Sequence, residues 1–100
     1  MIVKVKLGDV FYINWFRRTS SIYKLYRINY DIRQAYGVCI EDYKITRKAA
    51  FIVKHIDNDE IHLYLGDNFE GEFKLLPKLQ AILYEHVLDE YWSKYESSSK

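Results

Sequence analysis

The strongest local signal in the chain is a β-hairpin at residues 50–65, which have the sequence AFIVKHIDNDEIHLYL. Two stretches rich in β-branched and aromatic residues, 50–56 and 60–65, flank the polar triplet Asp57-Asn58-Asp59. Such side chains favour strands, and Asp and Asn favour the turn between two strands. We therefore expect an antiparallel hairpin here, and we expect the rest of the sheet to form around it.

Three further strands are expected in the N-terminal part of the chain. Apolar residues alternate with lysines over residues 3–7, a pattern typical of a strand with one buried face. A turn at Gly8-Asp9 leads to a second strand at residues 10–16. After the polar loop 17–21, a third strand is expected at residues 22–32, because its many Ile and Tyr side chains favour a strand over the amphipathic helix that the spacing also allows.

The middle of the chain gives weaker signals. In the third strand we expect the apolar side chains of residues 22, 26, 28, 30 and 32 to share one face. Residues 31–36 are compatible with a single helical turn that ends near Gly37. Two short apolar stretches, 38–40 and 43–46, are compatible with strands but too short to assign.

The C-terminal third predicts a turn, a short strand and a long helix. The turn covers residues 67–71 and the strand residues 72–75, and Pro77 stands where a helix can begin without losing a hydrogen bond. We expect a helix from there to residue 96. The predicted fold is a single α+β domain over residues 1–96, a small curled antiparallel sheet, SH3-like or barrel-like, with one long C-terminal helix, followed by a disordered tail at 97–100.

The expected helix has two apolar stripes. The first consists of Leu75, Leu79, Ile82, Leu83, His86 and Val87. The second consists of Tyr84, Leu88, Tyr91, Trp92 and Tyr95. In one interpretation the first stripe packs on the sheet and the second forms the interface of a homodimer, because Tyr and Trp are enriched at interfaces. In the other, a single wide core covers both stripes.

Charge is divided unequally along the chain. Residues 1–54 hold eleven Lys and Arg against four acids, a net +7, whereas residues 55–100 hold four Lys against ten acids, a net −6. The basic half predicts contacts with nucleic-acid phosphates through Arg17, Arg18, Lys24, Arg27, Lys4 and Lys6. Trp15 and Tyr23, if exposed, would stack on unpaired bases. The alternative is a solvated charged face that the acidic half of the same chain partly neutralises.

The acidic turns suggest a second function. Six acids surround the hairpin and the following turn: Asp57, Asp59, Glu60, Asp67, Glu70 and Glu72. They either keep the turns soluble or form an acidic edge that binds a basic groove of another protein. The second interpretation predicts an inhibitor or adaptor of a host protein that uses these turns and the aromatic helix stripe.

Neither a metal site, a cofactor site nor a catalytic motif is predicted. His55 faces His62 if Ile56 pairs with Ile61, but no third metal ligand is placed beside them. The single cysteine, Cys39, excludes an internal disulfide and favours a reducing cytoplasm. No apolar stretch is long enough to span a bilayer, and no signal peptide is expected. We therefore expect a cytoplasmic, non-enzymatic accessory protein, and the composition favours a virus or plasmid and a heat-adapted source.

A short resemblance adds a third function. Residues 7–13, LGDVFYI, resemble the opening strand of MazF-type toxin ribonucleases, in which an Arg-bearing loop also follows. Those proteins are small SH3-like barrels that cut RNA and dimerise. The resemblance implies a barrel-like start to the fold, and it implies ribonuclease activity with Arg17 or Arg18 as the catalytic arginine.

Overall fold

Seven strands and one helix make up the computed structural model, which describes residues 1–98. In chain order they are β1 (Ile2–Lys6), β2 (Val10–Trp15), β3 (Ser20–Asn29), β4 (Gln34–Glu41), β5 (Ile45–Asp57), β6 (Glu60–Tyr64), β7 (Gly71–Leu75) and α1 (Lys78–Ser98). The helix continues past residue 96, through the first two residues of the expected tail. Residues 99–100 of that tail lie outside the described residues.

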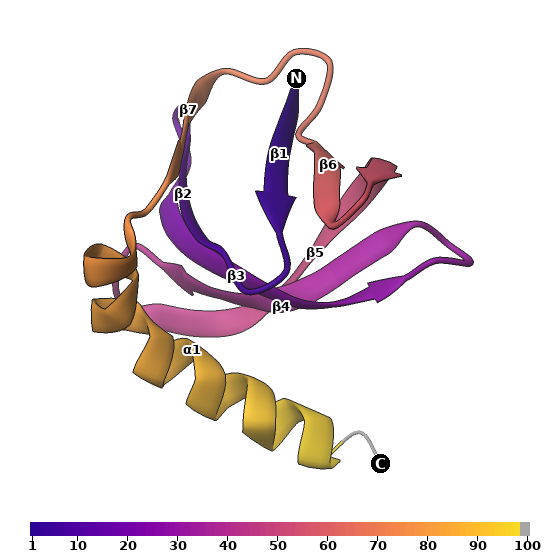
Figure 1. The fold of residues 1–100 in the computed structure, drawn as a ribbon. Coiled ribbons are helices and arrows are strands. Elements are labelled where there is room, and N and C mark those ends of the chain that lie inside the picture. Colours follow the sequence, from indigo (N-terminus) through magenta and orange to yellow (C-terminus); the bar gives the residue numbers. More distant parts are fainter. Residues whose placement is uncertain (99–100) are drawn as a thin grey trace.

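The strands form one antiparallel sheet in the order β1-β6-β5-β4-β3-β2-β7. The sheet curls so far that it forms a nearly closed barrel, and α1 runs along its outside (Figure 1). The predicted α+β fold, a curled antiparallel sheet with one C-terminal helix, is therefore confirmed. In the described part of the chain, no helix is long and apolar enough to cross a membrane.

Apolar side chains from all seven strands fill the inside of the barrel, β7 through the half-buried Phe73. Phe11 and Ile13 of β2 are fully buried there with Leu25 of β3 and Leu63 of β6. The ring of Phe11 stacks on that of Tyr23 at 5.4 Å between centroids. Interlocked aromatic rings contribute beyond the area that they bury, and they fix the shape of this inner core.

A second apolar core lies between the outer face of the barrel and α1. Val10, Ile22, Val38 and Ile40 point outward from β2, β3 and β4, and Leu88 of the helix is fully buried against this layer. Strands β2, β3 and β4 are therefore covered on both faces. Because two covered faces leave no polar side to a strand, such strands lack the apolar–polar alternation that marks a half-buried one.

Two predictions for the middle of the chain are wrong. The expected helical turn at residues 31–36 is a hairpin turn followed by the start of β4. The side-chain oxygen of Asn29 accepts hydrogen bonds from the backbone N–H groups of Asp31 and Ile32, which closes the turn. The strand predicted at residues 22–32 ends at Asn29 and does not keep one face, because the pairing of β3 with β4 is irregular between Leu25 and Arg27.

The two stripes of the helix are exchanged relative to the first interpretation. Of the stripe expected at a dimer interface, Leu88 is buried, and the other four residues, Tyr84, Tyr91, Trp92 and Tyr95, are half-buried. Trp92 stacks on Tyr26 of β3 at 4.8 Å, nearly parallel. The prediction that these side chains contact a partner is therefore wrong, because they pack on the sheet of their own chain. A homodimer as such stays a prediction.

The physical reason for this orientation is electrostatic as well as apolar. Glu85 and Asp89 flank the buried stripe, and both carboxylates bind Lys24 on the outer face of β3. Turning the helix to bury the other stripe would leave Lys24 without these partners on a covered face. An unpaired charge beside an apolar core is strongly unfavourable, so the ion pairs help to select the face that packs.

Candidate nucleic-acid interface

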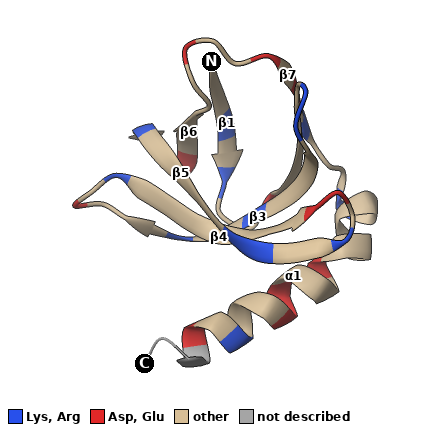
Figure 2. Ribbon diagram, turned by 180° about the vertical axis from the view of Figure 1, so that it is seen from behind, with Lys and Arg blue, Asp and Glu red and all other residues tan. Residues whose placement is uncertain are grey.

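The predicted phosphate-binding cations do not share one surface. Figure 2 shows Lys and Arg on several elements, with acidic residues along α1. Lys24 is the clearest departure from the prediction, because its side chain is only 11% exposed and lies beneath the helix. Its Nζ atom is 2.7 Å from an oxygen of Glu85 and 2.8 Å from one of Asp89. Lys24 therefore joins the helix to the sheet and is not available to a phosphate.

The titration behaviour of this cluster supports the same role. Burial lowers the pKa of Lys24, but its hydrogen bonds to Asp89 and Glu85 outweigh burial and leave the pKa above its ordinary value. Burial likewise raises the pKa of Asp89, and the bonds from Lys24 and Tyr26 outweigh it and leave the pKa below its usual range. Burial and the bond to Asp89 raise the pKa of the Tyr26 hydroxyl. Lys24 and Asp89 thus stay charged and paired.

The other predicted strand cations lie apart from one another. Lys6 on β1 forms an exposed ion pair with Asp59 at 3.6 Å, and Lys4 is exposed on the same strand. Arg27 lies over the ring of Tyr36, 5.3 Å from its centroid, and Tyr36 lines a cavity beside the C-terminal half of α1. These three side chains do not extend one binding surface.

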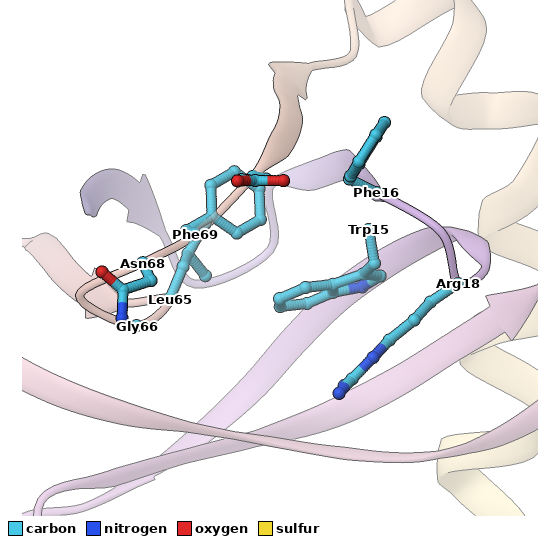
Figure 3. A pocket seen from close by; sticks show the side chains of 8 residues that line it. Trp15, Phe16, Arg18, Leu65, Gly66, Asn68 and Phe69 are labelled. Atoms are coloured by element: carbon cyan, nitrogen blue, oxygen red, sulfur yellow. The ribbon is translucent and has the colours of Figure 1, made fainter.

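Arg17 and Arg18, in contrast, lie at one end of the barrel in the exposed turn after β2. Arg17 has a left-handed backbone conformation, with φ at 62°, and its guanidinium lies 5.1 Å from the centre of the Phe16 ring. Arg18 points the other way and lines a cavity of about 380 Å³ together with Trp15. In Figure 3 the Trp15 ring lies between Arg18 on one side and Leu65 and Phe69 on the other, while Phe16 points away.

Trp15 is held firmly in this position. Its indole N–H donates a hydrogen bond of 2.8 Å to the hydroxyl of Tyr23, and Phe69 meets its ring edge-on at 5.4 Å. Trp15 itself is half-buried, so part of the ring still lines the cavity. Tyr23 is buried inside the barrel, and burial raises its pKa. The prediction that Tyr23 stacks on bases is therefore wrong, and its role is to position Trp15.

A second cavity, of about 480 Å³, continues the first along the mouth of the barrel. Both cavities are lined by Trp15 and Leu65, and the second adds Arg47, Lys48 and Tyr64. We refer to the two together as the mouth groove. Its walls combine aromatic rings and cationic side chains, as sites for single-stranded nucleic acids do, with two acids, Glu41 and Glu70.

The backbone of β5 adds hydrogen-bonding groups to the mouth groove. Residues 45–51 of β5 pair with β4 on one side, whereas pairing with β6 begins only at Ile52. Within the described residues, the other edge of this half-strand therefore has no neighbouring strand. Its side chains Ala49 and Ala50, which line the cavity, are small. Unpaired backbone N–H groups are donors that phosphate oxygens accept readily.

Arg47 and Lys48 are the site residues that sequence reasoning did not select. The guanidinium of Arg47 is bound to Glu41 at 2.9 Å, and Lys48 lies 4.1 Å from the centre of the Tyr95 ring. Both were counted in the basic half, but the predicted strand began at residue 50 and left them in a stretch without assigned structure. The adjacent pair of cations in residues 45–48, ITRK, was the only signal that could have identified them.

The remaining candidates carry no site in the described residues. His55 pairs with His62 across the hairpin, as predicted, with ring centroids 5.2 Å apart, but no third metal ligand joins them. Cys39 is buried, and burial raises its pKa to about 11. The acids of the two turns lie at opposite ends of β6, so they do not form one acidic edge.

Comparisons with family models, with curated proteins and with solved structures find no match to this chain, so its function must be argued from its own geometry.

Proposed function

We propose that this protein binds single-stranded nucleic acid in the mouth groove. The observation that carries the proposal is the placement of Arg18 beside the fixed, half-exposed ring of Trp15, in a groove that continues to Arg47. Arg18 binds a phosphate and Trp15 stacks on a base. The role is non-catalytic, and the buried free thiol of Cys39 is compatible with a reducing cytoplasm.

The groove favours a single strand over a duplex. A duplex presents its bases stacked and paired, so the Trp15 ring would meet only the backbone, whereas a single strand can place an unpaired base on it. Arg17, the neighbour of Arg18 in the chain, extends the cationic surface to the outside of the turn. Lys24 and Tyr23 have no part in this binding, because both are occupied within the fold.

The experiment is a binding titration with a fluorescently labelled single-stranded oligonucleotide, as RNA and as DNA, at low and moderate salt. Arg18→Glu should weaken binding by tenfold or more and reduce the salt dependence by about one ion. The matched control is Arg33→Glu, an identical charge change on an exposed arginine in the turn between β3 and β4. This control variant should lose only the small part of the binding affinity that depends on the net charge of the protein.

Three results would contradict the proposal. The wild type could fail to bind either oligonucleotide at low salt, Arg18→Glu could bind as well as Arg33→Glu, or a duplex could bind more tightly than a single strand. Gel analysis of the RNA after incubation adds a separate readout. Shortened RNA would indicate the ribonuclease activity implied by the resemblance to MazF-type toxins, in place of simple binding.

A further inference from the structure

One acidic side chain of the mouth groove, Glu70, calls for an explanation of its own. Glu70 lines the same cavity of about 380 Å³ as Trp15 and Arg18, and it is exposed. Its backbone is fixed at this place, because its carbonyl oxygen accepts a hydrogen bond of 3.1 Å from the backbone N–H of Phe16. A carboxylate repels phosphates, so an acid in a groove that binds nucleic acid has a role other than holding the backbone.

Two neighbouring acids differ from Glu70 because their carboxylates are engaged within the fold. Glu41, which lines the second cavity, binds Arg47 at 2.9 Å. Asp67 accepts a hydrogen bond from the hydroxyl of Tyr64, and this bond raises the pKa of Tyr64. Within residues 1–98, Glu70 forms no ion pair, and this holds also for Arg18 of the same cavity. Its carboxylate is therefore available to a ligand.

Arg18 and Glu70 present opposite charges to one cavity without neutralising each other. In Figure 3, Arg18 lies on one side of the Trp15 ring, and Asn68 lies on the other side with Leu65 and Phe69. A nucleotide carries its sugar and phosphate on one side of the base and its Watson–Crick edge on the opposite side. A nucleotide with its phosphate at Arg18 and its base on the Trp15 ring therefore directs that edge away from Arg18, toward the polar groups of the loop 66–70.

The chemistry of a carboxylate decides which base fits this edge. An ionised carboxylate accepts hydrogen bonds and donates none. Guanine presents two neighbouring donors, N1–H and the N2 amino group, which match the two oxygens of one carboxylate. Adenine and cytosine each place a ring-nitrogen acceptor beside their amino group, and uracil places a carbonyl oxygen on each side of its N–H. An acceptor that faces a carboxylate is repelled, so guanine is the base that fits best.

We propose that Glu70 makes the mouth groove selective for guanine at the position that stacks on Trp15. This inference rests on the proposed binding of single strands and names the base that the site selects. The carboxylate of Glu70 accepts the two N–H groups of guanine, and the side-chain amide of Asn68 donates to its O6 atom. Removing the carboxylate therefore changes which base is preferred more than it changes whether a strand binds.

The test compares two single-stranded RNA tracts that differ in one base. One is a tract of about nine uridines, a length within the site sizes of known single-strand binders, and the other has guanosine at its centre. The wild type should bind the guanosine tract at least about fivefold more tightly, the lower end of what a bidentate base contact provides. In Glu70→Gln this preference should fall below about twofold, because an amide has one acceptor oxygen. Its affinity for the all-uridine tract should rise slightly, because a negative charge is removed.

The matched control is Glu72→Gln, which removes the same charge from an exposed acid of β7 that lines neither cavity. This variant should keep the wild-type preference for guanosine. Equal binding of the two tracts by the wild type, with the binding still weakened by Arg18→Glu, would overturn the inference and leave the proposed function standing.

Two further results would also overturn the inference. If Glu70→Gln keeps the wild-type preference, the carboxylate acts only through its charge. If adenosine or cytidine at the central position binds more tightly than guanosine, the assignment of the base is wrong. A wild type that binds neither tract at low salt would contradict the proposed function itself, and the base selectivity with it.

Discussion

Replacing Leu88 by Ala tests which face of α1 packs on the barrel. Leu88 is 0% exposed and contacts the outward-facing apolar layer of β2, β3 and β4. A Leu→Ala change at a buried site costs roughly 2–5 kcal/mol, the lost transfer energy plus the cavity that remains. Because one helix on an open sheet face can shift to close part of the cavity, we expect about 2.5–4 kcal/mol. For a domain of this size that corresponds to a fall in Tm of roughly 10–25 °C.

Urea titration followed by far-ultraviolet circular dichroism measures the free energy of unfolding. The matched control is Leu79→Ala, the same change on the same helix at a side chain that is 83% exposed. It should change the free energy of unfolding by no more than about 0.5 kcal/mol. Measuring each variant at two protein concentrations tenfold apart separates any effect of dimer dissociation. Equal costs for the two changes, or a larger cost at Leu79, would refute the orientation of the helix.

Two further changes probe the contact between β3 and β4 and the ion pairs under the helix. Gly37→Ala should lower the free energy of unfolding, measured by chemical denaturation, by roughly 3 kcal/mol or more, because its Cβ atom would lie 2.0 Å from the backbone oxygen of Lys24. The control is Gly8→Ala, where the added Cβ atom meets nothing within 4 Å. This change should cost roughly 1–2 kcal/mol, because alanine is strained at the left-handed φ of 92°. Because the pKa of Asp89 is lowered in the folded state, this carboxylate stabilises the fold above its unfolded-state pKa, and the stabilisation is lost as the pH falls through the folded-state pKa. The Tm of the wild type should therefore fall more steeply from pH 5 to pH 2 than the Tm of Lys24→Met. Parallel profiles of Tm against pH would refute the pairing of Lys24 with Asp89.

Local patterns were sufficient for the elements that have one wet face. The hairpin at residues 50–65 was predicted, and its strands pair Ile56 with Ile61, the condition under which His55 was expected to face His62. Alternation over residues 3–7 gave β1, and Pro77 marked the residue before α1 begins. In each case the alternation of apolar and polar residues begins or ends within a few positions, so a short stretch of sequence is enough to predict the element.

Long-range contacts decided the features that the sequence left open. β3 and β4 are covered on both faces, so their apolar residues show no period. The register shifts between Leu25 and Arg27, next to the close approach of Gly37 to the backbone of β3. The two stripes of α1 are similarly apolar, and contacts with β3 distinguish them, among them the ion pairs of Glu85 and Asp89 with Lys24. Lys24 lies 61 residues from Glu85, and a local window cannot include it.

Ion pairs between the two halves of the chain partly neutralise the unequal charge of each half. Two predicted cations, Lys24 and Lys6, are paired with acids of the C-terminal half, so part of the net +7 is neutralised within the chain. Within residues 1–98, Arg17 and Arg18 form no ion pair with an acid, and Arg18 lines the mouth groove beside Trp15 while Arg17 lies over the ring of Phe16. The fold thus uses some of its cations to fix the helix and leaves others exposed. The excess of basic residues in one half is therefore larger than the number of cations left outside such ion pairs, and the proposed binding depends only on those that remain outside them.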